Sequence, residues 1–178
     1  MSSVRERLAA LATPLGIELP EAYLAFMERR PERGVLIRHL CNPGDPPSEW
    51  WPATLDFLEQ DIWRGRWTKV APNAHYMREE AEGFLSAGVE SVPGPAGTPF
   101  GSERLSRGFW IGEEDGDSVF LDAQTLGVFA WLAHEEEVEQ WAASFGEFVT
   151  HGQRMGRFAE PLYGPDSQER APRNSEKA

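Results

Sequence analysis

The stretch FWIGEEDGDSVFLD, residues 109–122, decides the fold, and LGVFAW, residues 126–131, follows it closely. Three short runs of apolar and aromatic residues make up these stretches. Four carboxylates and a glycine separate the first two runs, and Gly127 lies in the second connection. Acidic residues and glycine allow a chain to reverse direction at low steric cost. The pattern therefore predicts an antiparallel meander with an acidic rim.

Apolar residues at helical spacing predict helices ahead of the meander. The segments that show this spacing are residues 4–15, 20–30, 53–63 and 77–87. Leu55, Leu58 and Ile62 form the inward face of the third segment, and Leu85 belongs to the inward face of the fourth. Each of these segments is therefore expected to pack one side against a core.

The remaining regular elements follow from shorter signals. Residues 35–40 are rich in apolar side chains and predict a strand. Ser144 and Glu147 have the spacing of a capping box, which predicts the start of a final helix. Phe145 and Phe148 would lie on the buried face of that helix.

These elements predict one α+β domain over residues 1–163, with a central, mainly antiparallel sheet flanked by N-terminal and C-terminal helices. Residues 88–107 contain three prolines and four glycines, which predicts a long exposed loop. That loop is either a flap over a binding surface or a tolerated insertion. Residues 164–178 are polar and nearly free of apolar side chains, so we expect a disordered tail.

The charge of the chain narrows the classes of partner. The 178 residues carry a formal net charge of -12, and 40% of them are hydrophobic. Such a charge disfavours nucleic acid, which binds clustered Lys and Arg, and favours a basic protein. Cys41 is the only cysteine, which excludes internal disulfides and multi-cysteine zinc sites and indicates a reducing cytoplasm. Residues 1–15 have no continuous apolar run, so no export signal and no membrane anchor is expected there.

Carboxylates gather in the first turn of the meander and just after its third strand. The candidate partner-binding residues are Glu113, Glu114, Asp115, Asp117, Glu135, Glu136 and Glu137. The first four resemble an oxygen-rich Ca²⁺ turn, but they lack the alternating spacing and the final bidentate Glu of an EF-hand loop. We therefore predict a solvated acidic surface, with no metal and no cofactor.

Two further residues have both a structural and a catalytic interpretation. Asp122 lies where a strand ends, a position at which aspartate commonly caps a turn through the backbone. His134 is followed by glutamates and has no nucleophile at fixed local spacing, which favours a local hydrogen bond over a general base. The alternative is a small hydrolase that uses Asp117, Asp122 and His134 for acid-base chemistry.

Tryptophan is frequent, with seven copies in the chain. Trp110, Trp131 and Trp141 belong to the predicted sheet and its C-terminal flank, so they are expected in the core. Four more lie earlier in the chain: Trp50, Trp51, Trp63 and Trp67. Each of these either packs in the core or serves as an exposed anchor for a partner.

Several motifs together resemble the SUKH superfamily. The sequence LPEAYLAF, residues 19–26, is similar to its N-terminal helix motif, in which Leu-Pro precedes a helix with an aromatic pair. Residues 109–122, the Gly127 hairpin, His134-Glu135 and SFGEF, residues 144–148, agree with the family in order and spacing. Ala133 stands where the family often has an aspartate.

The resemblance implies an α+β fold with helices at both ends of the chain. Many bacterial members are immunity proteins that neutralise polymorphic toxins, and others regulate fungal cell-wall synthesis. On this basis we expect a non-catalytic, cytoplasmic immunity protein that occludes a basic toxin. A nuclease would be such a toxin. The alternatives are a regulatory scaffold and the small hydrolase described above.

Overall fold

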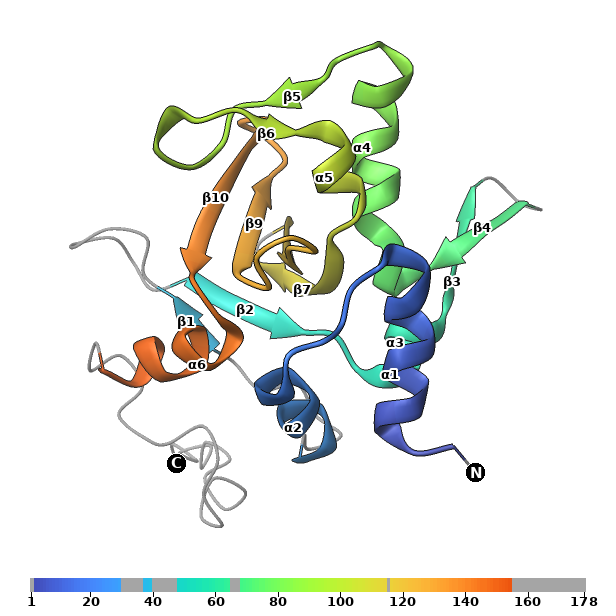
Figure 1. Cartoon of the computed structure of the whole chain (residues 1–178), viewed down its shortest axis with the longest axis vertical. Coiled ribbons are helices and arrows are strands. Elements are labelled where there is room, and N and C mark those ends of the chain that lie inside the picture. The colour runs from blue at the N-terminus through green and yellow to red at the C-terminus, as the bar shows by residue number, and fades with distance from the viewer. Residues whose placement is uncertain (1, 30–36, 40–47, 65–67, 115, 155–178) are drawn as a thin grey trace, which may run out of the picture.

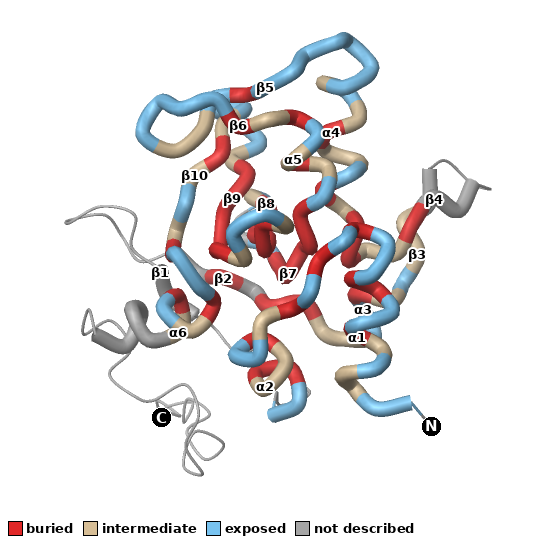
Figure 2. Tube along the Cα trace, in the orientation of Figure 1, coloured by how far each residue is buried: buried red, intermediate tan, exposed pale blue. Residues whose placement is uncertain are grey.

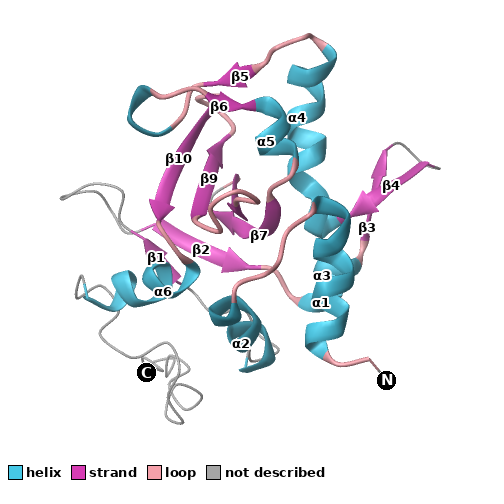
Figure 3. Ribbon diagram, viewed as in Figure 1, coloured by secondary structure: helices cyan, strands magenta, loops and turns pink. Residues whose placement is uncertain are grey.

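The computed structural model describes residues 2–29, 37–39, 48–64, 68–114 and 116–154. Within these ranges the chain is a mixture of helices and antiparallel sheet, as the sequence predicted (Figure 3). The predicted strand over residues 35–40 is described only as β1 (Ile37–His39). The predicted tail over 164–178 lies outside the described residues.

A six-stranded antiparallel sheet organises the molecule, in the order β1-β2-β7-β8-β9-β10. Its remaining strands are β2 (Ser48–Pro52), β7 (Phe109–Glu114), β8 (Asp117–Leu121), β9 (Val128–Leu132) and β10 (Glu137–Ala142). The predicted meander is β7-β8-β9, in which Leu121 pairs with both Phe109 and Val128. The pattern of residues 109–131 is thus confirmed as three paired strands.

Helices cover both faces of this sheet (Figure 1). Phe109 and Trp110 are consecutive in β7, so their side chains point to opposite faces. Phe109 contacts Tyr23 of α2 (Glu21–Arg29), with ring centroids 6.1 Å apart. Trp110 contacts Tyr76 at the start of α4 (Tyr76–Ser86), with centroids 6.0 Å apart. Figure 2 shows β7, β8 and β9 buried between these layers.

The N-terminal helices form as predicted. α1 (Val4–Ala12) begins at Ser3, whose hydroxyl accepts the Glu6 N–H in a capping box. A short 3-10 turn, η1 (Thr13–Leu15), contains Pro14 and leads towards α2. Arg5 forms ion pairs with Glu21 and Glu28 of α2, so α1 and α2 are joined by charge as well as by apolar contact.

The predicted helix over residues 53–63 is wrong in its second half. α3 covers only Leu55–Glu59, and Ile62 lies in β3 (Asp61–Arg64), which pairs with β4 (Thr68–Pro72). The backbone at Gln60 is extended and ends the helix. The helical spacing of three apolar residues does not show that a following segment can pair with them as a strand. Here the hydrogen bonds between β3 and β4 place Ile62 in a strand.

The fourth predicted helix is confirmed as α4, preceded by the 3-10 turn η2 (Asn73–His75). Met77 and Ala81 are buried, but Leu85 is 44% exposed, so its predicted inward position is wrong. Phe84 instead supplies the contact with the sheet, its ring 5.5 Å from that of Trp131. Leu85 belongs to the last turn of α4, where the helix is about to end.

The predicted loop over residues 88–107 contains regular structure. β5 (Ser91–Val92) pairs with β6 (Phe100–Gly101), a 3-10 turn η3 (Pro95–Gly97) joins them, and α5 (Ser102–Ser106) follows. Val92, Phe100 and Leu105 are buried in the core. The prediction of an irregular loop is wrong because a few buried apolar residues are enough to hold this segment against the core. Phe100, for example, packs on Phe120, with ring centroids 6.2 Å apart.

The last described helix is α6 (Phe145–Arg154). Ser144 accepts the Glu147 N–H at 3.1 Å, as predicted, but the Glu147 carboxylate bonds the N–H of Ala143 and not that of Ser144. Phe145 and Phe148 are buried, as predicted. Both rings contact Trp50, which is fully buried. Trp50 therefore packs in the core and is not an exposed anchor for a partner.

The other described tryptophan side chains differ in how far they are buried. Trp110 and Trp131 are buried as predicted, whereas Trp141 is half-buried and stacks on Phe148 with centroids 6.2 Å apart. The side chains of Trp51, Trp63 and Trp67 lie outside the described residues.

Among the described helices, none has the length and apolar character needed to cross a membrane.

Candidate functional site

The two acidic turns lie at the same end of the meander. Glu114 pairs with Asp117, so a two-residue turn joins β7 to β8. Leu132 pairs with Glu137, so residues 133–136 join β9 to β10. Because alternate turns of an antiparallel meander fall at the same edge, these connections are neighbours. The N–H of Ala133 donates to Asp117 Oδ1 at 3.1 Å and ties the two turns together.

The seven predicted partner-binding residues have different environments at this end. Glu113, Glu135 and Glu136 are exposed, and no Lys or Arg of the described residues forms an ion pair with them. Glu137 is half-buried. Asp117 is half-buried and holds the Ala133 N–H, so part of its role is structural. The side chain of Glu114 and the whole of Asp115 lie outside the described residues. We call this region, residues 113–117 and 133–137, the acidic end.

Asp122 lies at the opposite end of β8, about 17 Å from Asp117 for five residues of extended strand. Its carboxylate is fully buried and accepts two hydrogen bonds from Arg104, each 2.8 Å long. It also accepts the backbone N–H and the hydroxyl of Thr125, at 2.8 and 2.7 Å. The predicted turn-capping role of Asp122 is therefore confirmed, and the ion pair with Arg104 adds to it.

The pKa of Asp122 reflects these contacts. Burial by itself raises the pKa, but the hydrogen bonds from Arg104 and Thr125 outweigh it, so the carboxyl pKa lies below its ordinary value. The pKa of Arg104 is raised by its hydrogen bonds to Asp122. Both side chains are thus charged and mutually satisfied.

The turn that Asp122 caps differs from the prediction in one respect. Leu126, and not Gly127, adopts the left-handed conformation, with φ of 59°. Gly127 is required for space, because a Cβ there would lie 3.0 Å from the Ala142 carbonyl oxygen and from the Phe129 ring. The sequence signal at Gly127 was correct, but its cause is close packing against β10.

The residues of the hydrolase alternative do not converge. Asp122 is enclosed by Arg104 and Thr125 at one end of β8, whereas Asp117 and the exposed His134 belong to the acidic end. No group of three or more His, Cys, Asp or Glu side chains in the described ranges is arranged to hold a metal ion.

A pocket of about 170 Å³ opens beside the acidic end. It is lined by Phe57, Asn73, Tyr76, Trp110, Glu113, Gly116 and Ser118. The rings of Phe57 and Tyr76 lie 5.8 and 6.0 Å from that of Trp110, each tilted to it. Three aromatic walls and one carboxylate therefore meet here, and we call this the aromatic pocket.

A β-bulge places Trp110 and Glu113 in the same pocket. Residues three apart in a regular strand point to opposite faces. The register shifts between Trp110 and Gly112, so that Ile111 is an extra residue on β7. Gly112 has φ of 150°, which glycine adopts readily. The bulge brings Glu113 round to the face of the sheet that carries Trp110.

The other walls are held in place by hydrogen bonds. The Asn73 side chain donates to the Phe57 carbonyl oxygen at 2.9 Å, which ties η2 to α3. The Glu80 carboxylate of α4 accepts the Trp131 indole N–H at 3.0 Å and interacts with the Tyr76 hydroxyl. Burial, the bond to Glu80 and the negative charge of Glu80, Glu113 and Glu79 raise the pKa of Tyr76 to about 12.

Sequence reasoning missed this pocket. It placed Trp110 in the core, which is correct for most of the ring, and it assigned no role to Phe57 or Tyr76. The pocket walls come from α3, η2, α4, β7 and β8, so no local spacing predicts them. Gly112 after three large apolar residues was the one available hint of a bulge.

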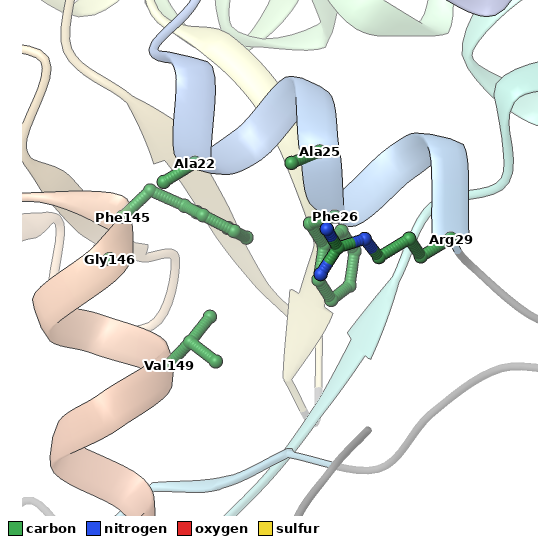
Figure 4. Close-up of a pocket in the computed structure, with 7 residues that line it drawn as sticks. All are labelled: Ala22, Ala25, Phe26, Arg29, Phe145, Gly146 and Val149. Carbon is green, nitrogen blue, oxygen red and sulfur yellow. The ribbon is translucent and has the colours of Figure 1, made fainter. Parts of the chain in front are cut away.

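A second hollow, of about 210 Å³, lies between α2 and α6 (Figure 4). Its walls include Phe26 of α2 and Phe145 and Val149 of α6, and among the described residues that line it Arg29 is the charged one. The groove is mainly apolar and lacks the carboxylates of the acidic end.

No family model matches the chain, and no curated protein or solved structure matches it.

Proposed function

We propose that the chain is a SUKH-like protein-binding domain, an immunity protein that neutralises a basic protein toxin in the cytoplasm by occlusion. The observation that carries this proposal is the acidic end. Two carboxylate-rich turns, far apart in sequence, are tied together by the bond between Ala133 and Asp117. Glu113, Glu135 and Glu136 are exposed there and free of ion pairs with the described basic residues.

The rest of the charge inventory supports the same proposal. Arg5 is paired with Glu21 and Glu28, Arg7 with Asp56 and Glu59, and Arg104 with Asp122. None of these ion pairs includes a residue of the acidic turns. Their carboxylates have structural roles because they hold helices and a turn together. Glu113, Glu135 and Glu136 form no ion pair with a described basic residue, and with a net charge of -12 the chain attracts a basic partner.

In this mechanism the acidic end covers the basic cleft of the toxin. Charge complementarity speeds the encounter and aligns the two proteins, and exclusion of substrate from the cleft stops the toxin. A nuclease cleft, built to bind phosphate, has the required charge. The SUKH-like motifs and the helices before and after the strands of the main sheet in the chain support this proposal.

The test uses the product of the gene directly upstream of the one that encodes this chain. That product is expressed in a bacterial host with wild-type chain or with the double variant Glu135→Lys, Glu136→Lys. Wild-type chain should restore growth. The double variant should bind about tenfold more slowly at low salt, and its association rate should depend less on salt.

A charge-matched control is Glu18→Lys, Glu103→Lys, since both residues are exposed and neither belongs to the acidic turns. This control should protect as the wild type does. Equal binding by the two double variants would show that charge at the acidic end is not used. An upstream product that is not toxic, or toxicity that the wild-type chain does not relieve, would refute the immunity function.

A further inference from the structure

We propose that the aromatic pocket is the receptor for one arginine side chain of the protein partner. This inference rests on the proposed function for its partner, but the pocket can be tested without that partner. It assigns the guanidinium group to the hollow that Phe57, Tyr76 and Trp110 line, with Glu113 as its counter-ion.

The shape of the pocket suits a flat cation. Its volume of about 170 Å³ is several times the roughly 30 Å³ that one water molecule occupies in the liquid. The Phe57 ring is inclined by 47° to the Trp110 ring, and the Tyr76 ring by 54°. A guanidinium plane can lie on an aromatic face, where the negative charge of the π-system attracts it.

The charge of the described pocket lining has the required sign. The described residues that line it include one carboxylate, Glu113, and no basic side chain. Glu80, which interacts with Tyr76 and accepts the Trp131 indole N–H, adds a further negative charge next to the Tyr76 wall. A guanidinium in the pocket could pair with Glu113 through two N–H groups, which lysine cannot do with the same geometry.

Other occupants fit the lining less well. A bound divalent cation usually takes several carboxylate ligands, and Glu113 is the one carboxylate among the described residues that line the pocket. An anion would be repelled by Glu113 and by the carboxylates of the neighbouring turn. A neutral apolar side chain would leave Glu113 without a counter-ion at the rim of the pocket.

The experiment titrates the isotope-labelled full chain with Nα-acetyl-L-arginine methylamide while the assigned indole signals of the tryptophans are recorded by NMR. The Trp110 signal should shift in a saturable way with a dissociation constant in the millimolar range. The uncharged norleucine analogue should give no saturable shift. Phe57→Ala and Glu113→Gln should each weaken arginine binding about tenfold.

Two control variants match these changes outside the pocket. Leu85→Ala shortens an apolar side chain that is 44% exposed, close to the 43% of Phe57. Glu103→Gln removes an exposed carboxylate on α5. Both should bind the arginine probe as the wild type does, and all the variants should keep the amide spectrum of a folded chain.

The outcomes separate the pocket from the proposed function. Binding of the arginine probe that survives Phe57→Ala and Glu113→Gln, or a norleucine analogue that binds equally well, would refute the pocket. A lysine analogue that binds as tightly would refute the guanidinium assignment. A chain that binds arginine in the pocket but protects against no upstream toxin would leave the pocket intact and remove only the immunity function.

Discussion

Arg104 and Asp122 form a bidentate ion pair in which Nε donates to Oδ1 and Nη2 to Oδ2, each at 2.8 Å. The Asp122 side chain is fully buried, whereas that of Arg104 is 24% exposed. The Arg104 guanidinium also lies 4.3 Å from the centre of the Phe100 ring. The pair therefore links α5 and β6 to the turn between β8 and β9. The buried Asp122 carboxylate depends on Arg104 for its counter-ion, whereas the Arg104 guanidinium can also be solvated by water.

The first prediction follows from that inequality. Arg104→Met should lower the free energy of unfolding by about 3–5 kcal/mol, because it leaves a buried carboxylate without its cation. Asp122→Asn should cost less, about 1.5–3 kcal/mol, since Arg104 reaches solvent and the amide oxygen can still accept the Thr125 N–H. Urea denaturation of both variants measures the difference. Equal costs would contradict the assignment of Asp122 as the dependent member.

The second prediction concerns the pH dependence of the same pair. The folded pKa of Asp122 is lowered, so the stabilisation is present above the unfolded value near 3.8 and is lost as pH falls through the folded pKa. The wild type should therefore lose stability below about pH 4 more steeply than Asp122→Asn. Thermal midpoints measured from pH 5 to pH 2 provide the test. Parallel curves would show that the ion pair does not titrate as stated.

The third prediction concerns His75, which is buried and whose Nε2 lies 2.7 Å from the Leu11 carbonyl oxygen. Burial lowers the pKa of this histidine, so the neutral ring is favoured in the folded chain. The associated stability is present above the unfolded value of 6.5 and declines as pH falls below it. His75→Gln can keep the hydrogen bond but cannot titrate. Its stability should fall less than that of the wild type between about pH 7 and pH 5.

The fourth prediction concerns the contact between α6 and the sheet. Phe148 is 2% exposed, and its ring lies 5.4 Å from that of Trp50 and 6.2 Å from that of Trp141. Phe148→Ala should destabilise the fold by about 3–5 kcal/mol, the cost of removing a core aromatic ring. Chemical denaturation followed by tryptophan fluorescence measures it. A loss below about 1 kcal/mol would place Phe148 among surface residues.

The fifth prediction concerns the turn between β9 and β10. Glu136 is exposed and has φ of 53°, a left-handed conformation that disfavours side chains with a Cβ. Glu136→Gly should stabilise the chain by about 0.5–1 kcal/mol, after the entropy of glycine is counted. Glu135→Gly is the matched control and should destabilise it by a similar amount. Thermal unfolding of the two variants measures these changes. Destabilisation by both substitutions would contradict the left-handed conformation of Glu136.

Local sequence patterns were sufficient for the meander and for most helices. The apolar runs of residues 109–131, the acidic turn and Gly127 are local signals, and the strand pairing of β7, β8 and β9 agrees with them. The same holds for α2 after Pro20 and for the start of α6, where Ser144 caps the Glu147 N–H. Such signals are local because backbone conformation and capping depend on near neighbours.

Contacts with other segments decided the rest. Ile62 lies in a strand and not in a helix because it pairs with Ala71 of the next strand, β4, and Phe100 is ordered because Phe120 and Phe129 pack on it. The meander brings the two carboxylate-rich turns to the same end of the sheet, and the tertiary structure adds the bond between Asp117 and Ala133 that ties them together.

The aromatic pocket depends on tertiary structure most of all. Its walls come from five elements, and a single extra residue in β7 turns Glu113 towards Trp110. One sequence could not reveal this arrangement, because a bulge depends on the register that the neighbouring strand imposes, and a pocket depends on which side chains the packed core leaves uncovered.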